Sequence, residues 1–175
     1  AINMIGKFVD QMQVSGRKTA VVTFPGDRTD ELIEESVKLL PKHFTHFIVK
    51  QDDNRRGRPS GEVAELIRSL LIKHGTKAEN IEIILDEQEA VNKALSSAVE
   101  GDYVVVFADK VSRCWKQITS FKSTGNVRVK DVDTRADDHL LERGEVDLIA
   151  DAISNATMRT DKRGVIIEIE EELND

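Results

Sequence analysis

The sequence predicts an α/β domain with a Rossmann-like, three-layer architecture and a mostly parallel sheet, followed by a C-terminal extension. From residue 2 to residue 121, short β-rich runs alternate with stretches of helical periodicity, a pattern typical of parallel strands joined by helices. The Ala20-Val21-Val22 core of the first run is nearly continuously apolar, as expected for a strand that is covered on both faces. The chain has 175 residues, 39% of them hydrophobic, which suffices for one well-buried domain.

The individual elements follow from the spacing of apolar residues and from the residues between them. Four strands are expected, at residues 19–24, 46–50, 81–85 and 103–108. Helices are expected before the first strand and after each strand, with apolar stripes at residues 5–12, 33–40, 63–71, 91–98 and 111–121. Pro41 is expected to stop the second helix, Ser60 to cap the third, and Asp86 with Glu89 to begin the fourth.

Polar residues follow the second strand in the run Lys50-Gln51-Asp52-Asp53-Asn54-Arg55-Arg56-Gly57-Arg58. In a parallel sheet, every strand-to-helix loop lies on the same side, and ligands bind at that side. Guanidinium groups bind carboxylate or phosphate with two parallel hydrogen bonds, so Arg55, Arg56 and Arg58 predict an anion-binding loop. The alternative is a mixed-charge surface loop whose charges neutralise one another. We favour the binding interpretation.

The turn after the first strand carries Gly26, Asp27 and Arg28 at the equivalent place, so the two loops are expected to converge. Glycine allows a tight turn and close approach of a ligand, and the two charged residues can orient a substrate. Equally, Gly26 can serve only the turn while Asp27 caps the helix. Asp109 and Lys110 follow the fourth strand and can complete the same rim, although for Asp109 a structural role at the helix start is preferred.

Several functional classes are disfavoured by what the sequence lacks. The stretch at residues 15–19 does not have the GxxxxGK[ST] spacing of a phosphate loop, and no GxGxxG follows the first strand. The four histidines show no ligand spacing, so no metal site is expected. A formal charge of −7 argues against a nucleic-acid surface, and no apolar run reaches the length of a membrane span.

Cys114 is the single cysteine, which predicts a reducing, cytoplasmic environment and a buried structural thiol. The composition changes near residue 124, so we divide the chain into a domain at 1–124 and an extension at 125–175. In the extension we expect a helix near residues 145–155, a last strand at 165–167 and an acidic, solvated tail.

Ordered motifs give the chain a family resemblance. They are Pro25-Gly26-Asp27-Arg28, then Asp52-Asp53-Asn54-Arg55-Arg56-Gly57-Arg58, then Ile83-Ile84-Leu85-Asp86-Glu87, and finally Phe107-Ala108-Asp109-Lys110. Over roughly residues 1–121, the chain resembles the C-terminal domain of the Mur ligase superfamily. Within that superfamily it is most similar to the cyanophycin synthetases.

The resemblance implies an ATP-dependent ligase that activates a carboxylate as an acyl phosphate and captures it with the amine of an amino acid. The domain is then expected to position the incoming amino acid, of aspartate or arginine type. Asp53, Asn54 and Arg56 match the family's DNxR-type substrate loop, and residues 26–28 match its GDR turn. Of the family's His-Asn-Pro motif near the nucleotide, only Asn3 is present, so Asn3, Asp109 and Lys110 are the nucleotide-proximal candidates.

The same resemblance implies that ATP and Mg²⁺ are held by an upstream central domain and that this chain alone is not catalytic. A homo-oligomer is a further possible assembly. The alternative is a stand-alone binding or interaction module that keeps the fold without the enzyme activity. An upstream phosphate-loop segment in the same reading frame would distinguish the two.

Overall fold

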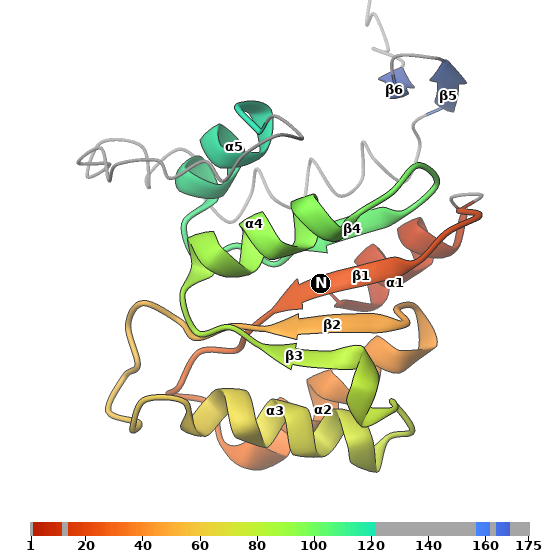
Figure 1. Cartoon of the computed structure of the whole chain (residues 1–175). Coiled ribbons are helices and arrows are strands. Elements are labelled where there is room, and N and C mark those ends of the chain that lie inside the picture. Colours follow the sequence, from red (N-terminus) through yellow and green to blue (C-terminus); the bar gives the residue numbers. More distant parts are fainter. Residues whose placement is uncertain (1, 12–13, 122–156, 162–163, 169–175) are drawn as a thin grey trace, which may run out of the picture. The chain divides into compact units, whose positions relative to one another are not determined.

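A four-stranded, all-parallel sheet forms the middle layer of the domain in the computed structural model (Figure 1). Its strands are β1 (Lys18–Val22), β2 (His46–Val49), β3 (Ile81–Ile83) and β4 (Tyr103–Val106), in the spatial order β3-β2-β1-β4. The structure describes residues 2–11, 14–121, 157–161 and 164–168. From β1 the chain moves outward to β2 and β3, then returns to the other side of β1 as β4, and ligands in such sheets bind where the order reverses.

Helices cover both faces of the sheet, which confirms the three-layer α/β prediction (Figure 1). One face carries α1 (Ile2–Gln11), α2 (Asp30–Val37) and α3 (Glu62–Lys73), and the other carries α4 (Glu87–Ser97) and α5 (Val111–Thr119). Two short 3₁₀ turns, Leu40–Lys42 and Ala78–Asn80, precede β2 and β3. Pro41 lies in the first of them, after α2 has already ended.

Strands β1, β2 and β4 contribute to two hydrophobic cores because successive side chains point to opposite faces. In β1, Ala20 and Val22 pack with α1, α2 and α3, whereas Val21 packs with α4 and α5. In β2, Phe47 and Ile48 divide in the same way. The nearly continuous apolar strands of the sequence therefore reflect burial on both faces.

The start of α3 corrects one prediction. Ser60 is not its N-cap: the cap position is Gly61, with a φ of 80°, and the helix begins at Glu62. The Gln51 side-chain oxygen accepts hydrogen bonds from the Gly61 amide (2.8 Å) and the Ser60 hydroxyl (3.1 Å). A residue ten positions earlier thus satisfies this helix end, which local sequence rules do not detect.

The N-caps of α4 and α2 test two further predictions, of which one is confirmed and one is wrong. Asp86 caps α4 as predicted and accepts a hydrogen bond from the Glu89 amide at 2.9 Å. At α2 the cap is Thr29, which accepts from the Leu32 amide. The alternative in which Asp27 caps that helix is therefore wrong.

The apolar side expected for α5, formed by Val111, Trp115, Ile118 and Phe121, is only partly correct. Val111 and Trp115 are 64% and 66% exposed, whereas Ile118 packs against the core and Cys114 and Gln117 are buried. The Gln117 side-chain nitrogen donates a hydrogen bond to the Gln88 carbonyl at 2.7 Å, so a polar residue with a partner on α4 occupies the inner face. The helix is rotated relative to the expected stripe, and the predicted burial of Cys114 is confirmed.

The chain divides into two compact units, Ala1–Lys130 and Asp131–Asp175. In the second unit, β5 (Thr157–Asp161) pairs antiparallel with β6 (Gly164–Glu168). The strand expected at 165–167 is present within β6, but its partner β5 was not predicted. The boundary expected after residue 124, the helix near 145–155 and the tail beyond residue 168 lie outside the described residues. Within the described part of the chain, no helix is long and apolar enough to cross a membrane.

Candidate functional site

The loops after β1 and β2 meet at the C-terminal edge of the sheet, as the sequence predicts. Gly26, in the β1–α2 loop, lies directly against the backbone of Arg55, in the β2–α3 loop. A Cβ atom at position 26 would lie 2.3 Å from the Arg55 carbonyl oxygen. Glycine at position 26 is therefore needed for the close approach of the two loops, in addition to any role in the turn.

Arg58 joins the two loops through its guanidinium group. Its Nε donates to the Gly26 carbonyl (3.0 Å) and its Nη2 to the Arg28 carbonyl (2.8 Å), and it forms ion pairs with Asp30 (2.7 Å) and Glu62 (2.9 Å). The hydrogen bonds that Arg58 donates to the Asp30 and Glu62 carboxylates raise the pKa of Arg58 above its usual value. These contacts assign Arg58 to holding the loops together, and a direct role in substrate binding stays a prediction.

The β2–α3 loop is shaped by its own aspartate and asparagine. Asp52, which is buried, accepts a hydrogen bond from the Asn54 amide, and Asn54 accepts one from the Arg56 amide, both at 3.1 Å. A tight turn follows in which Arg56 and Gly57 both have positive φ, 49° and 90°. Asn54 therefore has a structural function in the loop, whatever else it binds.

The arginines of the site differ in how they are occupied. Arg56 pairs with Asp27 at 2.6 Å, and this hydrogen bond raises the pKa of Arg56. Arg55 and Arg28 form no ion pair with any residue that the structure describes. Within the described part of the chain, these two guanidinium groups are the candidates for binding an anion.

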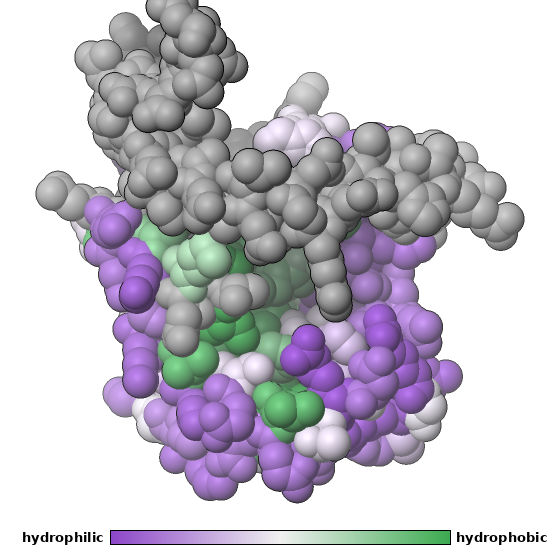
Figure 2. Space-filling model, turned by 180° about the vertical axis from the view of Figure 1, so that it is seen from behind, coloured by the Kyte–Doolittle hydropathy of each residue, from purple (hydrophilic) through white to green (hydrophobic). Residues whose placement is uncertain are grey.

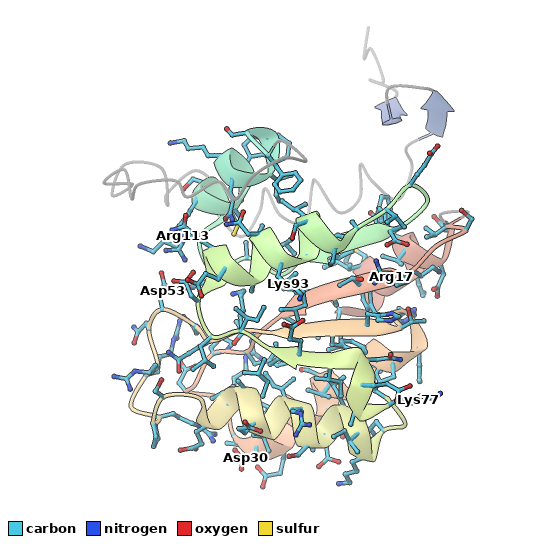
Figure 3. The ribbon with its side chains drawn as sticks, in the orientation of Figure 1. Arg17, Asp30, Asp53, Lys77, Lys93 and Arg113 are labelled. Carbon is cyan, nitrogen blue, oxygen red and sulfur yellow. The ribbon has the colours of Figure 1, made fainter. Side chains whose placement is uncertain are left out.

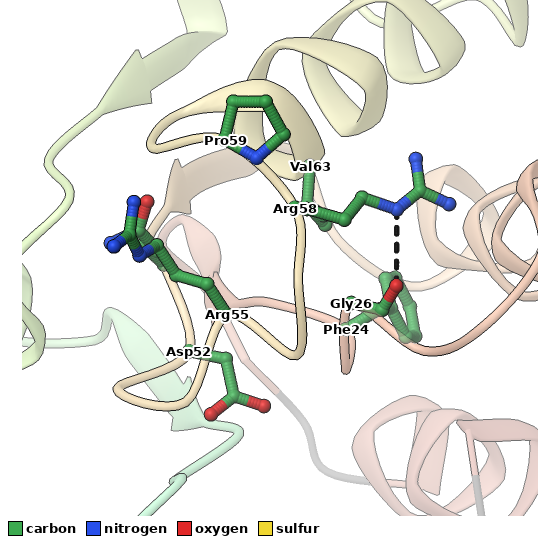
Figure 4. A pocket seen from close by; sticks show the side chains of 8 residues that line it. Phe24, Gly26, Asp52, Arg55, Arg58, Pro59 and Val63 are labelled. Carbon is green, nitrogen blue, oxygen red and sulfur yellow. Dashed lines mark hydrogen bonds between the residues drawn. The ribbon is translucent and has the colours of Figure 1, made fainter.

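A small pocket lies between the two loops (Figure 4). Its floor is apolar and its rim carries both signs of charge; the lining residues are Phe24, Gly26, Gln51, Asp52, Arg55, Arg58, Pro59 and Val63. Figure 4 shows Arg58 turned toward the Gly26 carbonyl and Arg55 on the other side of the loop. Its open volume of about 10 Å³ is room for about one water molecule, so the pocket marks the junction of the two loops and does not by itself enclose a ligand.

Arg28 also lines a wider groove on the face that carries α1 and α2. The groove is bordered by Ile2, Thr23, Phe24, Arg28, Ser36, Leu39 and Phe107. Figure 2 shows apolar side chains around a hollow on this face. Asn3 belongs to α1 and follows the groove residue Ile2 in the sequence. Its side chain is outside the part of the chain that the structure describes.

Asp109, after β4, contacts the β2–α3 loop. Its Oδ2 accepts a hydrogen bond from the Asp53 amide at 3.0 Å, so Asp109 completes the rim. Lys110, not Asp109, occupies the N-cap of α5, and it makes no side-chain capping bond. The preferred helix-start role for Asp109 is therefore wrong. Burial raises the pKa of Asp109, and the charges of Asp52 and Asp53 raise it further.

The sequence reasoning missed a buried group of charges beneath this rim. Lys50 and Glu87 are 0% and 2% exposed, and the Lys50 ammonium lies 2.9 Å from Glu87 Oε1. Arg113, on α5, donates to Glu87 and also to Asp53. Figure 3 shows Arg113 and Asp53 at the same end of the domain. The available signal was a lysine and a glutamate placed directly after two apolar strands, where buried charges need partners.

Neighbouring charges keep Glu87 ionised in spite of its burial. Burial alone raises the pKa of a carboxyl group, but the attraction of Lys50 and hydrogen bonds from Lys50, the Asp109 amide and Arg113 hold the pKa of Glu87 at about 2. The Cys114 thiol lies close to this carboxylate. Burial, and then the charge of Glu87, raise the pKa of Cys114 to about 12, which is consistent with a structural rather than a reactive thiol.

Comparison with known proteins decides the family. Residues 1–109 match the family described as "Mur ligase, glutamate ligase domain". The chain belongs to the Mur ligase family. This Mur ligase domain is 39% identical over 121 residues to the cyanophycin synthetase of Synechocystis sp., covering 69% of the chain and 14% of that protein. It is 41% identical over 114 residues to the cyanophycin synthetase of Nostoc sp., covering 65% and 12%.

A solved structure gives a weaker match to the Mur ligase domain. It is described as UDP-N-acetylmuramoyl-L-alanyl-D-glutamate–2,6-diaminopimelate ligase, with 24% identity and a TM-score of 0.47, covering 62% of this chain and 21% of that one. The chain spans only 12–14% of the length of the cyanophycin synthetases compared here. The family match includes both loops and ends at Asp109, so Arg113 lies just beyond it.

Proposed function

We propose that this chain is the substrate-positioning C-terminal domain of an ATP-dependent, amide-bond-forming ligase of the cyanophycin synthetase type. The observation that carries the proposal is the meeting of two family-matched loops at the C-terminal edge of the sheet, with Gly26 against Arg55 and Arg56 paired to Asp27. These loops surround a small pocket of mixed charge.

The charges of the site fit both ends of an amino acid. Arg55 has no ion-pair partner among the described residues, so its guanidinium can bind a substrate carboxylate with two hydrogen bonds. Asp52 and Asp109 are carboxylates at the same rim, and they favour an ammonium or guanidinium group. This pairing of signs supports an aspartate- or arginine-type substrate bound by residues 53–58 with help from residues 26–28.

ATP and Mg²⁺ are assigned in this proposal to an upstream central domain. Among the residues that the structure describes, no group of three His, Cys, Asp or Glu side chains is arranged to hold a metal ion. The contribution proposed for this domain is to bind and orient the amino acid. Asn3, Asp109 and Lys110 are the residues proposed to lie nearest the nucleotide.

Calorimetric titration of ATP, aspartate and arginine tests the proposal in protein expressed from the complete reading frame. We expect an amino acid to bind, and Arg55→Ala or Arg56→Ala to weaken its binding about 10-fold or more, because each removes a charged hydrogen-bond donor. Lys38→Ala, on the exposed surface of α2, is the matched control and should leave binding unchanged. Unaltered affinity in both loop variants would refute the loop's role. A wild-type protein that binds neither amino acid nor ATP would instead favour the stand-alone module.

A further inference from the structure

The proposed substrate-binding loop is held near both of its ends. At the C-terminal end of the loop, Arg58 attaches it to the β1–α2 loop. Near its start, Asp53 is bound twice: its Oδ2 accepts from Arg113 Nη1 at 2.9 Å, and its backbone amide donates to Asp109 Oδ2 at 3.0 Å. Arg55 and Arg56 lie between these attachments, so their position depends on both.

Both contacts to Asp53 lead back to the buried carboxylate of Glu87. Its Oε2 accepts from Arg113 Nε at 3.1 Å and Nη2 at 2.5 Å, and its Oε1 accepts from the Asp109 amide at 2.7 Å. Oε1 also lies 2.9 Å from the Lys50 ammonium. Glu87 is the first residue of α4, where the helix dipole favours a negative charge.

The Glu87–Arg113 contact is well shielded from water. The side chains of Glu87 and Arg113 are 1% and 10% exposed, so the hydrogen bonds between them are little weakened by water, whereas the Asp53 side chain that Arg113 also binds is 42% exposed. The hydrogen bonds that Asp52 and Asn54 make inside the loop each span only two residues and leave its orientation toward the sheet open. Arg58 and Arg56 attach the later part of the loop to the β1–α2 loop, and the contact from α5 attaches its start at Asp53.

We infer that Glu87 and Arg113 are positioning residues, which act through Asp53 to hold residues 53–58 in the conformation that receives the amino-acid substrate. This inference rests on the proposed function of the loop. Neither side chain needs to touch the substrate. Because they fix the loop before binding, less conformational entropy is lost when the substrate arrives, so affinity rises without any added contact.

Steady-state kinetics in the protein from the complete reading frame test the inference. Arg113→Gln should raise the KM for the amino acid about 10-fold and leave the KM for ATP unchanged. Arg113→Lys keeps the charge but cannot bind Glu87 and Asp53 with one planar fork, so it should recover only part of the loss. The matched control is Arg17→Gln, which breaks a comparable arginine–aspartate pair, with Asp102, at the other end of the sheet. It should leave both KM values unchanged.

A double-mutant cycle separates positioning from a general loss of structure. If Arg113 acts through Asp53, then Arg113→Gln combined with Asp53→Asn should raise the KM no more than the larger of the two single substitutions. Effects that multiply fully would show that Arg113 acts independently of the loop, and would overturn the inference.

Backbone amide exchange distinguishes failure of this inference from failure of the proposed function. Faster exchange at residues 53–58 in Arg113→Gln, but not in Arg17→Gln, is expected whether or not an amino acid binds. A wild-type protein that binds no amino acid would reject the proposed function. Wild-type binding that Arg113→Gln leaves intact, together with unchanged exchange, would reject only the positioning role.

Discussion

The two ends of the parallel sheet each hold an arginine–aspartate pair, but the pairs serve different surroundings. At the N-terminal end, Arg17 binds Asp102 through its backbone amide (2.7 Å), Nε (3.0 Å) and Nη2 (2.8 Å). Asp102 also accepts from the Val99 amide at 3.2 Å. At the C-terminal end, Arg113 binds Asp53 and at the same time Glu87.

The two ends differ in whether charged side chains without an ion-pair partner lie beside the arginine–aspartate pair. The N-terminal pair joins the segments before β1 and β4 and satisfies its own groups locally. At the C-terminal end, the network fixes a loop while Arg55 and Arg28 keep no ion-pair partner among the described residues. Both ends therefore contribute to stability, and the C-terminal end in addition carries the loop proposed to bind substrate, at the edge where parallel sheets generally place ligands.

The largest effect on stability is expected from removing the buried carboxylate at the C-terminal end. Glu87→Ala leaves the fully buried Lys50 without its partner and should lower the free energy of unfolding by about 3–5 kcal/mol. Urea denaturation measures this loss. Asp102→Ala, at the other end, should cost less because its partner Arg17 is 41% exposed and can be solvated. Equal losses would remove the contrast between the two ends.

Substitution of one glycine at each end of the sheet should have an intermediate effect on stability, and only one of the two substitutions should also affect binding. A Cβ atom at Gly16 would lie 2.7 Å from the Gly101 backbone, and one at Gly26 would lie 2.3 Å from the Arg55 carbonyl oxygen. Each change to alanine should destabilise the domain by about 1–3 kcal/mol through overpacking. Only Gly26→Ala should also weaken amino-acid binding, as titration calorimetry would show. Weaker binding in Gly16→Ala would contradict the separation of the two ends.

A third contrast between the two ends is expected in acid sensitivity. The pKa of Glu87 is lowered from 4.5 to about 2, so its contribution to stability is complete above pH 4.5 and is lost as the pH falls toward 2. Hydrogen bonds from Arg17 lower the pKa of Asp102 in the same direction. In Glu87→Gln, the fall of unfolding free energy across this pH range should be shallower than in wild type. An identical slope would show that Glu87 is not the titrating group.

Most of the fold follows from the sequence because its signals are local and repeated. Strands β1, β2 and β4 are mostly apolar on both faces, the edge strand β3 carries the exposed Glu82, and the helices between them have clear stripes, so element type and order are predictable. The errors occur where a distant group intervenes. Gln51 takes the capping role expected of Ser60, and the carbonyl of Gln88 draws Gln117 to the inner face of α5.

The candidate site was predictable in its location and in part of its membership. The convergence of the two loops follows from parallel topology, and the arginine-rich run marks one of them. The connections to Glu87 and Arg113 were not predictable because they join residues more than twenty positions apart. Arg58 was predicted as a binding residue, yet its guanidinium is occupied by the chain itself.

The sequence by itself determined the α/β class, the family resemblance and the edge of the sheet at which binding residues gather. These conclusions depend on the periodicity of apolar residues and on short motifs, and both can be recognised within one segment of the sequence. Only the tertiary structure decided which charges are shared within the protein and which remain available to a ligand. Arg55, Arg56 and Arg58 are the same residue type in one run of the sequence, but they differ in their ion pairs. Folding places carboxylates beside Arg56 and Arg58, and the partners of a charged side chain determine whether it can bind a ligand.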